Sequence, residues 1–178
     1  VYKRQIDKLE AYKQHSTDAD LIQEADYMLV YAAYEQGRPN ADELLKDYLE
    51  EYPASRHSDE IGYMIGSVHF ERGEYEKAIF WFNEADIDML SPEQQEAYSF
   101  RLAYSLLQIG EMEKARGYFA RIEQIGDKYK EASTYYVAYI DYAMGNYNNA
   151  LIEFSHLKES PKYREQSQYL SLIHISEP

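Results

Sequence analysis

The chain has 178 residues and a formal net charge of −14, with 45% apolar and 28% charged residues. A chain of this length can form about one compact domain. Its acidity repels phosphate backbones, so we expect no nucleic-acid partner and instead favour a neutral or basic protein or peptide. The sequence contains no cysteine, which excludes disulfides, thiolate nucleophiles and cysteine-based metal sites. No apolar run reaches the length of a membrane span, so we expect no direct membrane insertion of this segment.

The two ends of the chain can be encoded by the same DNA read on opposite strands. Residues 1–5 can be written as GTG TAT AAG AGA CAG, and the reverse complement encodes Leu-Ser-Leu-Ile-His, the sequence of residues 170–174. Both ends resemble the translated transposon adapter used in preparing sequencing libraries. We therefore interpret residues 1–5 and 170–178 as adapter-derived, and residues 6–169 as a fragment of a larger protein.

Helical patterns then follow one another in pairs. The segment 6–17 carries Ile6, Leu9 and Tyr12 near helical spacing and predicts the end of a preceding helix. Four units follow, each with the pattern of a helix, a glycine turn and a second helix. The first helices are predicted at residues 18–36, 58–72, 92–109 and 128–144, and the second helices at residues 40–52, 75–88, 112–124 and 147–158.

A glycine recurs between the paired helices at spacings of 36, 37 and 35 residues. In the second unit, Gly73 is followed by Ala78 and Phe82. The glycine ends a helix in a left-handed conformation, the alanine lets two helices approach closely, and the phenylalanine one turn later fills the space between them. Equivalent residues are Gly110, Ala115 and Phe119, then Gly145, Ala150 and Phe154, with Gly37, Leu44 and Tyr48 as a looser first set. Small residues at the matching point of the first helices are Gly66, Ala103 and Ala138, with Val30 in the first unit.

Gly66, Ala78-x3-Phe82 and Pro92 together resemble the tetratricopeptide repeat. This resemblance implies an all-α, right-handed superhelical solenoid of antiparallel helix-turn-helix repeats. Repeats are assigned to residues 18–57, 58–91, 92–127 and 128–161, with 6–17 as the end of a preceding repeat and 162–169 as the start of a truncated fifth. The units depart from the family pattern in lacking its early tryptophan and in running one to three residues long.

The linker at residues 48–55 reads Tyr-Leu-Glu-Glu-Tyr-Pro-Ala-Ser and precedes an Ala- and Tyr-rich segment. It resembles the linkers of bacterial cell-envelope repeat proteins, which include outer-membrane assembly lipoproteins and periplasmic cell-wall coordinators. The resemblance favours the periplasm or the outer membrane of a Gram-negative bacterium, with the cytoplasm as the alternative.

The chain holds 20 tyrosines against 6 phenylalanines and 1 tryptophan. Family geometry implies that the fifth, ninth and twelfth positions of each repeat line a concave face, and many tyrosines fall there. The predicted peptide-binding groove consists of Tyr27, Tyr31, Tyr34, Tyr63, Ser67, Phe70, Phe100, Arg101, Tyr104, Tyr135, Tyr139 and Tyr142. Tyrosine combines a large contact area with a hydroxyl, which suits a peptide with apolar anchors. Packing between helices is the alternative role, and it is favoured for Tyr34, Phe70 and Tyr142.

No catalytic constellation, phosphate loop or cofactor motif is present, so we expect neither an enzyme activity nor a cofactor. Glu153-x-x-His156 matches half of a di-iron motif, but no second copy exists. We interpret the pair as polar residues on a solvated helix face and expect no metal site.

These observations favour a protein-protein interaction scaffold that binds a peptide or protein segment on a Tyr-rich groove. Two other interpretations stay open: a structural spacer or self-associating solenoid without a groove, and the non-catalytic part of a larger enzyme. The repeat fold alone does not separate them, because one fold hosts many functions.

Overall fold

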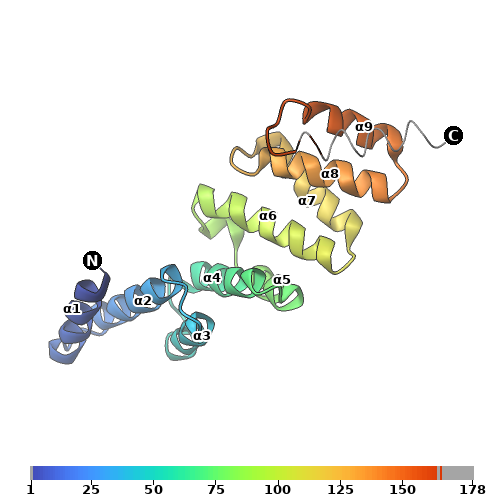
Figure 1. Cartoon of the computed structure of the whole chain (residues 1–178). Coiled ribbons are helices and arrows are strands. Elements are labelled where there is room, and N and C mark those ends of the chain that lie inside the picture. Colours follow the sequence, from blue (N-terminus) through green and yellow to red (C-terminus); the bar gives the residue numbers. More distant parts are fainter. Residues whose placement is uncertain (1, 164, 166–178) are drawn as a thin grey trace. The chain divides into compact units, whose positions relative to one another are not determined.

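The computed structural model describes residues 2–163 and 165, and every regular element in that part of the chain is helical (Figure 1). The elements are α1 (Tyr2–His15), α2 (Ala19–Glu35), α3 (Ala41–Glu51), α4 (Ser58–Glu71), α5 (Tyr75–Glu84), the short 3-10 helix η1 (Ile87–Met89), α6 (Pro92–Gln108), α7 (Met112–Ile125), α8 (Lys130–Ala143) and α9 (Tyr147–His156). Within these described residues, no helix has the length and apolar character needed to cross a lipid bilayer. Residues 166–169 of the predicted fifth repeat and the predicted adapter residues 170–178 lie outside the described residues.

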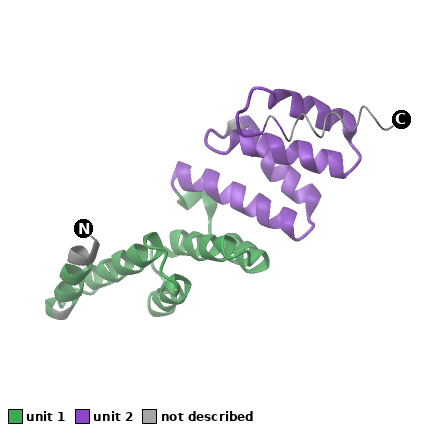
Figure 2. Cartoon of the chain, in the orientation of Figure 1, with its two compact units in different colours: residues 1–90 green, residues 91–178 purple. Residues whose placement is uncertain are grey.

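The chain divides into two compact units, which are described separately (Figure 2). Unit 1, Val1–Leu90, contains α1 to α5 and η1. Unit 2, Ser91–Pro178, contains α6 to α9. In each unit, consecutive helices pack against one another as helix pairs.

The predicted helices agree with the structure to within about two residues at most ends. The prediction for residues 75–88 is wrong at its C-terminal end, because α5 stops at Glu84 and Ala85 is extended. The chain then turns through η1, where the Asp86 side chain accepts a hydrogen bond from the Asp88 backbone. At α6, Ser91 forms the N-cap as part of a capping box with Gln94.

The four repeated glycines take the left-handed conformation predicted for them. Their φ values are 61° at Gly37, 72° at Gly73, 86° at Gly110 and 81° at Gly145. At Gly73 the amide donates to the Phe70 carbonyl and the next amide donates to the His69 carbonyl, a helix-ending pattern that satisfies the last carbonyls of α4. The glycine therefore sets the tight turn between the two helices of a pair.

The second helices bury one common set of positions. Ala78 and Phe82 on α5 are fully buried, as are Ala115 and Phe119 on α7 and Ala150 and Phe154 on α9. A methyl group at Gly66 of α4 would lie 2.6 Å from the Phe82 ring, so the absence of a side chain there lets the two helices approach closely.

In the first repeat the predicted register is wrong. Leu44 is half-buried, whereas Ala41 and Leu45 on α3 are buried at the spacing of the other pairs. Ala41 is the first residue of α3 and lies four residues after Gly37, whereas the alanines of the other units lie five residues after their glycines, so the buried pair of the first repeat precedes the predicted Leu44 and Tyr48. Tyr48, predicted to fill the inter-helix space, is buried one turn after Leu45. Val30 of α2 is half-buried, so it does not mark a close approach.

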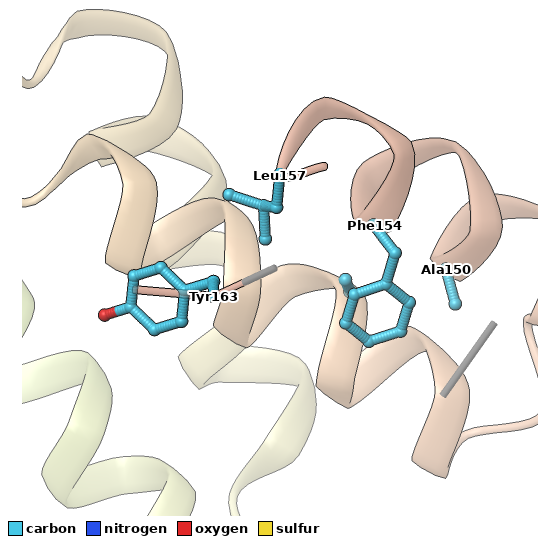
Figure 3. Close-up of a cluster of buried hydrophobic side chains, with 5 residues drawn as sticks. Ala150, Phe154, Leu157 and Tyr163 are labelled. Carbon is cyan, nitrogen blue, oxygen red and sulfur yellow. The ribbon is translucent and has the colours of Figure 1, made fainter. Parts of the chain in front are cut away.

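The last buried cluster of unit 2 joins α8, α9 and the segment after α9. Ala138 of α8 packs with Ala150, Phe154 and Leu157, and Figure 3 shows Tyr163 in the same cluster. Tyr163 belongs to the predicted start of a fifth repeat, yet its side chain completes the core of the fourth. The end of the described chain is therefore packed against the repeat that precedes it.

Candidate protein-interaction site

A cleft of about 500 Å³ with a mostly apolar lining lies between α1 and α2 of unit 1. Its lining residues are Ile6, Lys8, Leu9, Tyr27, Met28, Tyr31 and Ala32. Two residues of the predicted groove, Tyr27 and Tyr31, lie in this lining. The amphipathic α1 supplies Ile6 and Leu9, and α2 supplies the aromatic side.

Tyr27 is held in place from α4. Its hydroxyl donates to Glu60 Oε2 at 2.6 Å, and its ring stacks on the His57 imidazole with centroids 3.6 Å apart and planes 5° apart. Burial and the Glu60 carboxylate raise the pKa of the Tyr27 hydroxyl well above that of a free tyrosine. The ring is therefore a fixed, neutral aromatic surface at the edge of the cleft.

Tyr31 and Met28 are the exposed apolar side chains of the cleft. Tyr31 is 37% exposed, Met28 is 47% exposed, and the Tyr31 ring lies 5.9 Å from that of Tyr27. Exposed apolar side chains that converge on a concave surface are typical of binding sites for apolar groups.

The predicted groove is wrong at two positions on α4. Tyr63 and Ser67 are buried, because α4 is covered along the stretch from Ile61 to Ser67. Ser67 Oγ donates to the Tyr63 carbonyl one turn earlier at 2.8 Å, and the Tyr63 ring packs 6.3 Å from that of Phe82. Both side chains belong to the core of unit 1.

The other predicted residues of unit 1 are half-buried. Phe70 makes an edge-to-face contact with Tyr75, with ring centroids 6.2 Å apart, in line with the packing role favoured for it. Tyr34 is also half-buried. Of the predicted groove residues in unit 1, Tyr31 is therefore the exposed one, and Tyr27, Tyr34 and Phe70 are half-buried.

In unit 2 the predicted groove residues surround Tyr136, a tyrosine that is not among the predicted groove residues. Tyr136 lies 6.0 Å from Phe100, 5.5 Å from Tyr104 and 5.4 Å from Tyr135, measured between ring centroids. Phe100 also stacks on Tyr129 at 4.6 Å. Burial raises the pKa of the Tyr136 hydroxyl. Tyr136 is the residue directly after Tyr135, a predicted groove position. Consecutive residues of a helix project in different directions, so a prediction based on one face of the helix does not include Tyr136.

Only part of the unit 2 set is accessible. Tyr139 is 41% exposed, whereas Tyr135 is half-buried and stacks on Tyr163 at 5.0 Å. Tyr142 contacts the Tyr147 ring at 5.5 Å, and Tyr104 and Arg101 are half-buried. Tyr139 is therefore the most accessible of these predicted residues.

Acidic side chains stand beside the aromatic pair of unit 1. Glu24 accepts from Arg56 at 2.5 Å and lies 3.2 Å from His57 Nε2. Burial acts to raise the pKa of Glu24, but the hydrogen bonds to His57 and Arg56 prevail and lower it. Glu60 accepts the hydrogen bond from the Tyr27 hydroxyl. The Glu24 and Glu60 carboxylates thus contact His57 and Tyr27, the two stacked rings, and help to hold them in position.

Comparisons with known proteins give two family matches. A family described as "Outer membrane lipoprotein" (YfiO) matches residues 1–74, and one described as "Tetratricopeptide repeat" (TPR_6) matches residues 96–125. No curated protein matches the chain significantly.

Two solved structures of MamA have a similar fold. The structure of MamA AMB-1 is 18% identical, with a TM-score of 0.65, and the match covers 93% of this chain and 94% of MamA. The structure of MamA MSR-1 is 17% identical, with a TM-score of 0.60, and the match covers 97% of this chain and 96% of MamA. At this identity the likeness concerns the fold alone.

Proposed function

Because this chain is an all-α protein of tetratricopeptide repeats, we propose that it binds an extended or helical protein segment in the cleft between α1 and α2 of unit 1. The single observation that carries the proposal is the fixed Tyr27 ring beside the exposed Met28 and Tyr31 in a concave, apolar lining. Aromatic side chains of this kind supply large contact areas with little loss of side-chain freedom. The proposed role is binding rather than catalysis.

The proposed partner segment is neutral or basic and carries apolar anchors. The net charge of the chain is −14, which attracts basic segments and repels acidic ones. Tyr139 of unit 2 offers a second accessible aromatic contact. The match of residues 1–74 to an outer-membrane lipoprotein family supports a role in a bacterial cell envelope.

Selection of peptides from a random display library against the full chain tests the proposal. We expect enriched peptides with apolar or aromatic anchors flanked by neutral or basic residues. Met28→Asp places a charge in the cleft and should weaken their binding at least about tenfold. Met89→Asp changes a methionine that is 71% exposed and outside the cleft, so it should leave binding unchanged.

Equal peptide affinity for the Met28→Asp and Met89→Asp proteins would contradict the cleft as the binding site. A chain that forms dimers or larger species in sedimentation experiments, and enriches no peptides, would instead support the self-associating interpretation.

A further inference from the structure

Three side chains with metal-binding atoms come together between α7 and α9 of unit 2. Glu123 comes from α7, and Glu153 and His156 come from α9. One ligand atom from each residue lies within 4.8 Å of the other two. The Glu153-x-x-His156 pair visible in the sequence thus gains a third donor that is distant in sequence.

Helix geometry accounts for two of the three donors. Glu153 and His156 are three residues apart, so they project from the same side of α9. Nδ1 of His156 lies 3.2 Å from Glu153 Oε2, which brings the imidazole and the carboxylate to the same point. Glu153 is half-buried and His156 is exposed, so the point is reached from solvent.

A hydroxyl on α8 orients the third donor. Thr134 Oγ1 donates to Glu123 Oε1 at 2.9 Å, and α8 packs against both α7 and α9. Hydrogen bonds of this kind hold metal-binding carboxylates in position, and they leave the second carboxylate oxygen free to coordinate.

Arg116 interacts electrostatically with both Glu123 and Glu153, but it makes its hydrogen bonds with a different carboxylate. Its guanidinium is bound by Asp141 through hydrogen bonds of 2.8 Å and 2.7 Å. A divalent cation bound between Glu123 and Glu153 would neutralise both carboxylates.

We propose that Glu123, Glu153 and His156 form a binding site for a divalent transition-metal ion of the zinc class. Two carboxylate oxygens and one imidazole nitrogen form a mixed donor set that suits Zn²⁺ and its neighbours better than Ca²⁺ or Mg²⁺, which prefer six or more oxygen ligands. Solvent supplies the remaining position. The ion would connect the second helices of two consecutive repeats and so stabilise unit 2. This site is separate from the cleft of unit 1 and does not depend on it.

Titration of the untagged, chelator-treated full chain with Zn²⁺ in a calorimeter tests the proposal. We expect one ion per chain at micromolar concentration, and a rise in melting temperature when the ion is bound. Glu123→Gln and His156→Gln should each weaken binding at least about tenfold, because each removes one of three protein ligands. Co²⁺ in the same site should give visible absorption bands that change in the His156→Gln protein.

Matched controls use an exposed residue of each type outside the cluster. Glu113→Gln lies on α7 and His15→Gln on α1, and both should bind Zn²⁺ as the unaltered chain does. Circular dichroism of all four variants checks that the helices are retained. The proposal is overturned if the unaltered chain takes up no Zn²⁺ at micromolar concentration, or if the Glu123→Gln and His156→Gln proteins bind as tightly as the controls.

Discussion

The ring of Tyr27 lies parallel to the imidazole of His57, with centroids 3.6 Å apart and planes 5° apart. This stack joins the middle of α2 to the residue that precedes α4. Tyr27 also lines the apolar cleft, so the contact between α2 and the residue before α4 fixes an aromatic surface of the proposed binding site. Stability and binding are therefore connected at this residue.

Removing the imidazole should affect both properties. His57→Ala deletes the stack on Tyr27 and the contact with Glu24, and we expect unit 1 to lose about 0.5–1.5 kcal/mol of unfolding free energy. Urea titration followed by circular dichroism measures the loss. His15→Ala changes an exposed histidine on α1 and is the control. If the two variants unfold at the same urea concentration, the stack contributes nothing to stability.

The register of the second helices predicts a large difference in stability between substitutions at two positions on α5 that lie two residues apart. Phe82 is fully buried between helices, whereas Phe80 is 58% exposed. Phe82→Ala should cost about 3–5 kcal/mol because it leaves a cavity in the core. Phe80→Ala should change stability by no more than about 0.5 kcal/mol. Equal melting temperatures for the two variants would show that the buried face of α5 is assigned wrongly.

Sequence periodicity was sufficient to predict most of the fold. Gly73, Ala78 and Phe82 each have a steric requirement that depends on near neighbours in the chain, so their pattern predicts the helix pairs correctly. The first repeat shows the limit of this reasoning. Its turn departs from that of the other units, and Leu44 was predicted for the small buried position that Ala41 occupies.

The candidate site could be predicted only in part. The stripe of positions identified Tyr27 and Tyr31, which line the cleft, but it also included Tyr63, which is buried against Phe82. How deeply the first helix of a repeat is buried depends on how closely the neighbouring helices pack against it. The spacing of residues along one helix does not reveal how closely the other helices pack. Glu123 illustrates the same limit, because its approach to Glu153 follows from the packing of α7 and α9 around α8.

Two glycines inside helices should respond to alanine in opposite directions. A methyl group at Gly66 would lie 2.6 Å from the Phe82 ring, so Gly66→Ala should cost about 1–3 kcal/mol. No atom lies within 4 Å of the corresponding position at Gly117 on α7, so Gly117→Ala should stabilise by about 0.5–1 kcal/mol. Thermal unfolding of both proteins measures the two effects.

A double variant identifies the cause of the loss at Gly66. Phe82→Leu makes room for the added methyl group, so Gly66→Ala should cost less in its presence than in the unaltered chain. Strictly additive losses would mean that the Phe82 ring is not what the methyl group meets.

Asp42 should make unit 1 sensitive to acid. Burial acts to raise the pKa of this carboxyl, but hydrogen bonds from Arg72 at 2.8 Å and Lys46 at 3.1 Å prevail and lower it to about 2, from 3.8 in an unfolded chain. Because the folded value is the lower one, the stabilisation is complete above pH 3.8 and is lost as the pH falls toward about 2. The loss of unfolding free energy is on the order of 1–2 kcal/mol.

Urea titrations across this pH range should therefore show a smaller acid-dependent loss of unfolding free energy for Asp42→Asn than for Asp47→Asn, which alters an exposed carboxyl on the same helix. The same pH dependence in both variants would assign the acid sensitivity to other carboxyls.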